Sequence, residues 1–299
     1  MNEIKQVNSD HIYEILQIWN LSNERTNEIY QSKDNATYEI GDRYILKYNP
    51  NTVQVEENLK LIKLLSEADI PMVKVVPTST GSMVSACNRY VLMERSKGVH
   101  LDSQTASGSE IQAFGRELAR LHQVLKAKES ELDYRNENFL QTWKHYIKPG
   151  LENVDEVLVQ EVEEKLVRNF EKLPQQPIHR DVHFHNVLFD QGSLTAWLDF
   201  DLTEKNARIF DLAYFLAGEL VDAIKEEDSL RRWQQLYKNF LVGYHEVNPL
   251  SNEEVEALPI LMIGIELLFV TYWHHEKNEI ERGKALALAE WLYTQYFKI

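Results

Sequence analysis

Residues 177–201 read PIHRDVHFHNVLFDQGSLTAWLDFD, and this stretch decides the fold. Three of its polar residues could carry chemistry: Asp181 and Asn186 in a short polar loop, and Asp199 after the last apolar run. The residues between them predict a β-hairpin, with a strand, a turn and a returning strand at 187–189, 191–193 and 194–198. Because a tight hairpin brings its two ends together, we expect the three side chains to share one site.

Such a set contains the groups that phosphoryl transfer uses. The Asp181 carboxylate could orient an acceptor hydroxyl and take its proton. Mg²⁺ prefers oxygen ligands and usually takes one or two from the protein, while phosphate and water supply the rest. Asn186 and Asp199 fit that number, and the ion would neutralise charge on the phosphates. The residues therefore predict a magnesium-dependent transfer of phosphate to a hydroxyl.

The order of three motifs identifies a family resemblance. His179-Arg180-Asp181, followed by Asn186, resembles the catalytic loop of eukaryotic-type protein kinases. The wider stretch is more similar to the aminoglycoside phosphotransferase and choline kinase family, where an H-x-D-x-x-x-x-N loop precedes a hairpin, an I-D-F/W-D segment and a D-L-A helix start. Residues 198–201 (LDFD) and 211–213 (DLA) match the last two motifs. Three motifs in the right order are far more specific than a lone H-x-D.

The resemblance implies a bilobal, protein-kinase-like α+β fold with ATP and Mg²⁺ as cofactors. A small β-rich nucleotide-binding lobe would comprise residues 1–95, a larger and mostly helical catalytic lobe residues 96–299, and the nucleotide would bind in the cleft between them. Asp211 would brace the backbone of the catalytic loop. The role of Asp201 stays open between binding metal or substrate and capping the next segment.

The first 95 residues predict a sheet with packed helices. Apolar spacing predicts a leading helix over 9–21 and an amphipathic helix over 53–68. β-branched and aromatic runs between turn residues predict six strands, at 28–30, 37–40, 43–48, 73–76, 82–85 and 89–93.

Lys47, on the third of these strands, resembles the kinase lysine that contacts the α- and β-phosphates. The helix after it would supply the glutamate that positions the lysine. Glu57 shares a face with apolar residues and could point inward, whereas Glu56 lies on a face that is typical of solvent exposure. We therefore expect Glu57 to be the partner of Lys47, with Glu56 as the alternative.

Two further segments would contact the nucleotide. The chain has no glycine before Gly41, so the turn at 31–35 replaces a Gly-rich loop, and Ser32 and Asn35 would contact phosphate there. In the resembled family a hinge between the lobes contacts adenine through its backbone. The polar run that begins at Met93 and Glu94 ends in a glycine, which can supply the dihedral freedom that a hinge uses.

From about residue 103 the pattern becomes helical. We expect helices at 107–125, 141–147, 157–170, 210–219, 229–246, 252–273 and 281–297. In this family the acceptor binds to the helical lobe. Aromatic and acidic residues at 143–146 and 273–276 could hold an ammonium group there, although packing in the core and at helix ends explains them better.

Bulk composition narrows the class further. A hydrophobic content of 43% supports a packed core, and a net charge of −15 argues against a nucleic-acid partner while suiting either solubility or a cationic acceptor. The one cysteine, Cys87, fits a reducing, cytoplasmic compartment. Because the first residues contain no apolar run, we expect no secretory signal. The apolar stretch at 257–273 contains Glu266 and is shorter than the roughly 20 residues of a membrane span, so we expect no membrane partner.

Other interpretations stay open. His179, His183 and His185 could bind zinc with Asp181, but this would leave Asn186 without a role. Arg180 stands where the small-molecule kinases often have glycine, which keeps a Ser/Thr protein kinase possible, and the glycine-poor loop keeps a non-catalytic nucleotide-binding scaffold possible. The main expectation is an ATP-dependent kinase for a hydroxyl of a small molecule such as an aminoglycoside, amino alcohol or hydroxy amino acid. The sequence does not name the acceptor.

Overall fold

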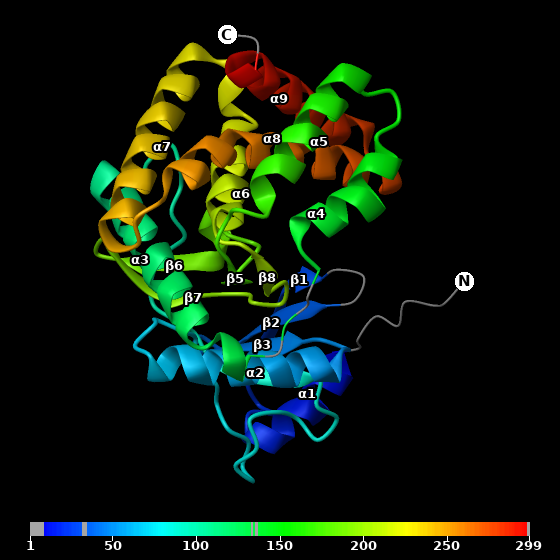
Figure 1. The fold of residues 1–299 in the computed structure, drawn as a ribbon. Helices are drawn as coiled ribbons and strands as arrows, with labels where there is room; N and C mark the ends of the chain where they lie inside the picture. The colour runs from blue at the N-terminus through cyan, green and yellow to red at the C-terminus, as the bar shows by residue number, and fades with distance from the viewer. Residues whose placement is uncertain (1–8, 32–34, 133, 135–136, 298–299) are drawn as a thin grey trace. The chain divides into compact units, whose positions relative to one another are not determined.

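The computed structural model describes residues 9–31, 35–132, 134 and 137–297 (Figure 1). The chain forms two compact units. Unit 1 comprises Met1–Val99 with Thr195–Asp201, and unit 2 comprises His100–Leu194 with Leu202–Ile299. The expected division after residue 95 did not include the short second segment of unit 1, which carries Asp199.

Unit 1 is built on a four-stranded antiparallel sheet with the strand order β1-β2-β3-β4. Its strands are Thr26–Gln31, Ala36–Ile40, Tyr44–Tyr48 and Tyr90–Glu94. In β2, buried and half-buried residues alternate strictly, which is the period of a strand with one face on the core. The register places Lys47 of β3 between Thr37 of β2 and Val91 of β4. Four of the six expected strands are therefore confirmed.

Two helices accompany this sheet. Helix α1 spans Ser9–Leu16 and is followed by a single 3₁₀ turn at Gln17–Trp19, so the expected leading helix is shorter than its apolar pattern. Its buried side chains join the inner face of the sheet in one apolar core: Ile12, Leu16, Trp19, Ala36, Tyr38, Ile40, Leu46, Tyr90 and Leu92. Helix α2 spans Thr52–Glu67, and the Asn51 side chain caps its first turn.

The strands expected at 73–76 and 82–85 are wrong. Val75 forms only an isolated bridge with Met93. Pro77, directly after the first segment, and Pro71, two residues before it, cannot donate ladder hydrogen bonds. In the second segment, side chains compete for the backbone. The Ser82 hydroxyl donates to the Val84 carbonyl at 2.9 Å, and the Ser85 hydroxyl accepts from the Tyr90 amide at 3.1 Å.

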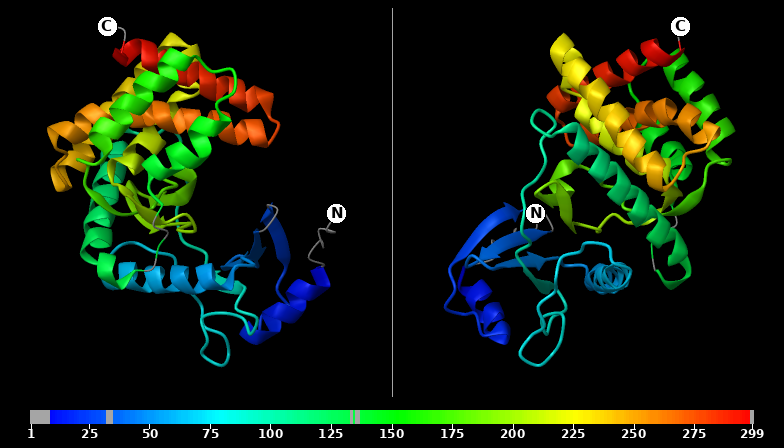
Figure 2. Two further views of the ribbon diagram at one scale, coloured as in Figure 1. Left: turned by 45° about the vertical axis from the view of Figure 1, so that its right-hand side comes forward. Right: turned by 90° about the vertical axis from the view of Figure 1, so that its left-hand side faces the viewer.

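Unit 2 is mostly helical, and all seven expected helices are present among its described residues. Figures 1 and 2 show their arrangement. The helices are α3 Gly108–Ala127, α4 Phe139–Thr142 continued by a π-helical turn at Trp143–Ile147, α5 Glu156–Phe170, α6 Ile209–Leu220, α7 Glu227–Val247, α8 Asn252–His275 and α9 Glu279–Phe297. Helices α3 and α7 lie side by side, and their backbones approach closely at Gly115 and Gly243 (Figure 2). A Cβ atom on Gly243 would lie 2.0 Å from the Gln112 carbonyl oxygen.

Helix α8 is long and apolar enough to cross a membrane by length and composition. Of its most apolar window, however, 67% is buried inside the protein. Leu258, Ile263, Leu267 and Glu266 are almost completely inaccessible. The helix therefore has the burial expected of a core helix.

Two short sheets carry the residues of the opening motif. Strand β5, Gln175–Ile178, pairs antiparallel with β8, Glu204–Ala207. Strands β6, Val187–Asp190, and β7, Ser193–Trp197, form the expected hairpin. Both residues of its turn have positive φ, 49° at Gln191 and 78° at Gly192, as the turn type favoured by two-residue hairpins requires.

Candidate active site

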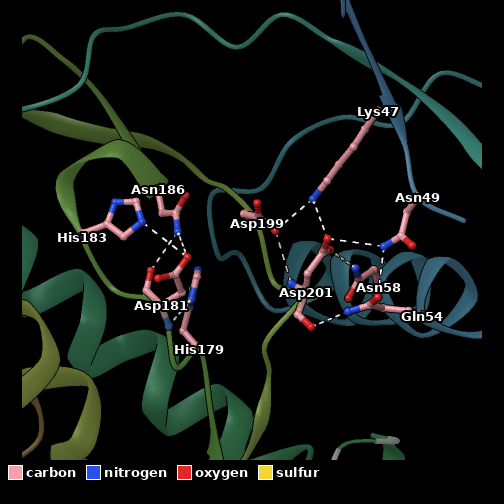
Figure 3. A network of polar contacts seen from close by, with 10 residues as sticks. All are labelled: Lys47, Asn49, Gln54, Asn58, His179, Asp181, His183, Asn186, Asp199 and Asp201. Atoms are coloured by element: carbon pink, nitrogen blue, oxygen red, sulfur yellow. Dashed lines mark hydrogen bonds and ion pairs between the residues drawn. The ribbon is translucent and has the colours of Figure 1, made fainter. Parts of the chain in front are cut away.

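Asp181 lies in the loop that follows β5, and neighbouring side chains fix both of its carboxylate oxygens. Figure 3 shows the contacts of His183 and Asn186 with this carboxylate. The Tyr214 hydroxyl donates to Oδ1 at 2.9 Å, and Nδ2 of Asn186 donates to Oδ2 at 2.9 Å. Nε2 of His183 lies 3.4 Å from Oδ2. The carboxylate therefore has one orientation, and 23% of the side chain is exposed to solvent.

The surroundings of Asp181 keep it ionised. Burial alone would raise its pKa, but the hydrogen bond and charge of His183, the charge of His179 and the Tyr214 hydroxyl outweigh burial and lower the pKa to about 2. A carboxylate with so low a pKa is a weak base. This suits phosphoryl transfer, in which positioning of the acceptor contributes more than full removal of its proton.

Asn186 presents its amide oxygen to a cation. The amide nitrogen is occupied, because Nδ2 donates to the Asp181 carboxylate and also to the Asp181 carbonyl at 2.8 Å. The side chain is buried, with 7% exposure. Among the described residues, no hydrogen bond is made to Oδ1, and an amide oxygen is a ligand that Mg²⁺ accepts.

Asp211 braces this loop from the first turn of α6, as the resemblance implied. It is fully buried, and it accepts hydrogen bonds from the backbone amides of His179 at 2.9 Å and Arg180 at 2.7 Å. Nε2 of His122 lies 2.9 Å from the same carboxylate, and Nδ1 of His122 lies 2.8 Å from the Tyr244 hydroxyl. A continuous network thus ties the loop to helices α3, α6 and α7.

Arg180 has a structural partner within unit 2. Its Nε lies 2.7 Å from Oε1 of Glu204, on β8, and Glu204 is 5% exposed. Burial raises the pKa of Glu204, and the nearby Arg180 guanidinium opposes that rise. The backbone of Arg180 is left-handed, with φ of 72°. The arginine is therefore one half of a largely buried ion pair.

Unit 1 carries the second group of expected residues. Nζ of Lys47 lies 2.9 Å from Oδ1 of Asp199 and 3.1 Å from Oδ2 of Asp201 (Figure 3). Burial would lower the pKa of Lys47, but the two carboxylates outweigh burial and raise it, so the lysine stays charged. The sequence had paired Lys47 with Glu57 and had left Asp201 unassigned.

Helix α2 does not supply the expected glutamate. Among the described residues, the ion pairs of Lys47 are to the two aspartates, and Glu57 is half-buried on α2 without an ion pair to the lysine. The helix instead directs two amides toward Asp201. The side chain of Asn58 donates to the Asp201 carboxylate, and Nε2 of Gln54 donates to its carbonyl at 2.5 Å.

The four residues expected to contact the nucleotide lie in two segments of unit 1. Met93 and Glu94 lie at the end of β4, and the Glu94 amide already donates to the Lys74 carbonyl at 2.8 Å. Ser32 lies outside the described residues, while Asn35 is half-buried just before β2. The roles of these four residues in binding nucleotide stay predictions.

The histidines do not form a zinc site in the part of the chain that the structure describes. No three His, Cys, Asp or Glu side chains there gather in a way that could hold a metal ion. The rings of His183 and His185 are tilted against each other with centroids 5.9 Å apart. His179 is buried and accepts from the Asp181 amide at 3.3 Å, so it acts within the loop.

The sequence is similar to homoserine kinases of several bacteria. The chain is 32% identical over 166 residues to homoserine kinase of Chelativorans sp., covering 52% of this chain and 48% of that protein. Homoserine kinase of Phenylobacterium zucineum is 31% identical, and the chain spans 40% of its length. The first relatives are therefore matched over less than half of their length, whereas homoserine kinase of Methylobacillus flagellatus is 24% identical over 95% of this chain and 86% of its own.

Solved structures share the fold over nearly the whole chain. An amicoumacin kinase in complex with AMP-PNP, Ca²⁺ and its ligand matches with a TM-score of 0.75 and 19% identity, covering 96% of this chain and 95% of that one. A microcompartment-associated aminopropanol kinase matches with a TM-score of 0.71, also at 19% identity, over 96% and 98%. The protein-kinase-like α+β fold is confirmed.

A family model gives the same assignment from sequence. It describes the phosphotransferase enzyme family, APH, and matches residues 27–250. This range contains the lysine strand, the catalytic loop, the hairpin and the bracing aspartate. The chain therefore belongs to the phosphotransferase enzyme family.

Proposed function

We propose that this chain is a kinase that transfers the γ-phosphoryl group of ATP to a hydroxyl of a small molecule. The observation that carries the proposal is the Asp181 carboxylate, which is ionised, held by three side chains and placed on a braced loop beside the open amide oxygen of Asn186. An ionised carboxylate next to a cation ligand is the arrangement that a hydroxyl nucleophile and Mg-ATP need.

Each residue has one role in this reaction. Asp181 accepts a hydrogen bond from the acceptor hydroxyl and takes its proton as the oxygen bonds to the γ-phosphorus and the bond to the β-phosphate oxygen breaks. Asn186 and Asp199 would hold Mg²⁺, which would neutralise phosphate charge. Their amide and carboxylate oxygens are the hard donors that this ion prefers. Lys47 binds the α- and β-phosphates.

The acceptor belongs to a chemical class that the related proteins suggest. Homoserine and aminopropanol, named by relatives of this chain, each carry a hydroxyl and an amine. A protein with a net charge of −15 attracts such cations. We therefore propose a hydroxy amino acid, an amino alcohol or an aminoglycoside as acceptor, and a cytoplasmic location.

The other interpretations have less support. The protein-kinase interpretation was based on Arg180. The guanidinium of this arginine is paired with the buried Glu204, which gives the residue a structural role. The interpretation as a non-catalytic scaffold was based on the glycine-poor turn before β2. Such a scaffold does not require an ionised, oriented carboxylate at position 181.

The proposal is tested by measuring ADP release from Mg-ATP with a panel of hydroxy amino acids, amino alcohols, aminoglycosides and sugars. We expect one class to raise turnover far above the rate without acceptor, and Asp181→Asn to lower kcat by at least about a hundredfold. Asp190→Asn, which changes an exposed carboxylate on β6, is the matched control and should retain wild-type turnover. Near-complete activity of Asp181→Asn would refute the assignment. Radiolabel transfer to protein alone would favour the protein-kinase interpretation.

A further inference from the structure

Two carboxylates contact Lys47, but only one of them has a place in the proposed chemistry. Asp199 is the proposed metal ligand, and a divalent cation attracts a carboxylate more strongly than an ammonium group does. With Mg-ATP bound, Asp199 would therefore share its charge with the metal. Asp201, 3.1 Å from Nζ, is then the anion that remains for the lysine.

The structure holds Asp201 firmly. Its side chain is 12% exposed, and three amide side chains surround the residue (Figure 3). The side chain of Asn58 donates to Oδ1, Nδ2 of Asn49 lies 3.5 Å from Oδ2, and Nε2 of Gln54 donates to the backbone carbonyl. Nδ2 of Asn49 also donates to Oε1 of Gln54 at 3.1 Å, so a hydrogen bond between two of these partners fixes their positions.

The chemistry of these partners suits a positioning role. Amide groups donate hydrogen bonds to a carboxylate without neutralising it, so the charge of Asp201 stays available to Lys47. Gln54 and Asn58 are one helical turn apart and therefore share one face of α2. Among the described residues, the contacts from α2 to Asp201 come from these two amides, and Glu57 makes no ion pair with the lysine.

We propose that Asp201 is the residue that positions Lys47 for the phosphates of ATP, and that α2 acts on the lysine through Asn58 and Gln54 instead of through a direct ion pair with Glu57. This inference rests on the proposed function, because it assumes that Lys47 binds phosphate. It assigns a role to a carboxylate that the sequence could not place, and it makes the lysine site depend on amides as well as on charge.

The test is calorimetric titration of Mg-AMP-PNP into the full chain, which needs no acceptor. We expect Asp201→Asn to weaken binding about tenfold, because it removes one charge of a largely buried, hydrogen-bonded ion pair. Glu57→Gln should weaken binding much less. Asp42→Asn, at an exposed carboxylate in the β2–β3 turn of the same unit, is the matched control and should bind like the wild type.

Steady-state kinetics separate positioning from general damage. Asp201→Asn should raise the KM for ATP by about the same factor and leave the KM for the acceptor within about twofold. Asn58→Ala should shift the KM for ATP in the same direction, which tests the helix contribution if Asp201→Asn folds poorly.

The outcomes distinguish the two proposals. A wild-type chain that does not bind Mg-AMP-PNP overturns both the proposed function and this inference. A wild-type chain that binds, together with an Asp201→Asn variant that binds equally well or a Glu57→Gln variant that is impaired more, overturns the inference alone and leaves the kinase assignment standing.

Discussion

Replacing Asp211 by asparagine should destabilise unit 2 strongly. The carboxylate is fully buried and has three partners, the amides of His179 and Arg180 and the imidazole of His122. Asparagine keeps one acceptor oxygen, which can retain one backbone amide, and its NH₂ group can turn to His122. The other backbone amide then faces an NH₂ group and loses its acceptor.

The size of the effect follows from these contacts. A hydrogen bond to a charged group contributes about 1.5–3 kcal/mol, and a buried donor left without an acceptor costs about 1–3 kcal/mol. We therefore expect Asp211→Asn to lower the free energy of unfolding of unit 2 by about 3–5 kcal/mol, which is a large fraction of the roughly 5–15 kcal/mol typical of a domain.

The measurement is urea unfolding followed by far-UV circular dichroism and by the fluorescence of the tryptophans buried in unit 2, Trp143 and Trp233. The unfolding transition of unit 2 should have its midpoint at a lower urea concentration in Asp211→Asn than in the wild type. Asp190→Asn, an exposed carboxylate in the same unit, should leave it in place. If both variants unfold at the wild-type midpoint, the three contacts do not support the loop and the reasoning is refuted.

Three other expectations can be measured directly. Gly243→Ala should destabilise the protein by about 2–3 kcal/mol in thermal or urea unfolding, because its Cβ would lie 2.0 Å from a backbone oxygen, whereas Gly218→Ala, with nothing within 4 Å of its Cβ, should stabilise α6 by about 0.5–1 kcal/mol. Tyr214→Phe should lower kcat several-fold. It should also move the acidic limb of the pH–rate profile to higher pH, because the lost hydroxyl helps to keep the pKa of Asp181 low. An unchanged pH–rate profile would contradict this prediction. Because that pKa is about 2 in the folded protein and 3.8 in a free side chain, Asp181 adds stability above about pH 4 that is lost as the pH falls toward 2. Between about pH 4 and pH 2, the free energy of unfolding should therefore fall less for Asp181→Asn than for the wild type, which acid unfolding measures.

Much of the fold could be predicted from the sequence because its patterns are local. The apolar spacing of the helices and the alternation in β2 depend on neighbours within a few residues, and both are present in the structure. The catalytic loop was predicted from the family resemblance that the spacing of His179, Asp181 and Asn186 carries. The bracing role of Asp211 followed from the family resemblance alone, because an aspartate at a helix start would by itself predict an N-cap.

The missing parts are contacts between distant segments. Asn58 and Asp201 are 143 positions apart, and no pattern in α2 indicates which polar side chain meets a carboxylate. Glu57 was chosen because its neighbours are apolar, but being near buried residues does not determine the partner of a side chain. Tyr214 lies among apolar residues in the first half of α6, so the sequence did not single it out. Its distance of one helical turn from Asp211 was the available signal that its hydroxyl could reach the same loop.

The left-handed backbone at Arg180 limits how this chain can diverge. With φ of 72°, the position suits glycine, and an arginine in this conformation is strained by about 1 kcal/mol. Yet Arg180→Gly would leave the carboxylate of Glu204, 5% exposed, without its cation. Relief of strain at one position therefore creates an unpaired charge at the other. We therefore expect Arg180 and Glu204 to be replaced together in evolution, with Glu204 lost before or at the same time as Arg180.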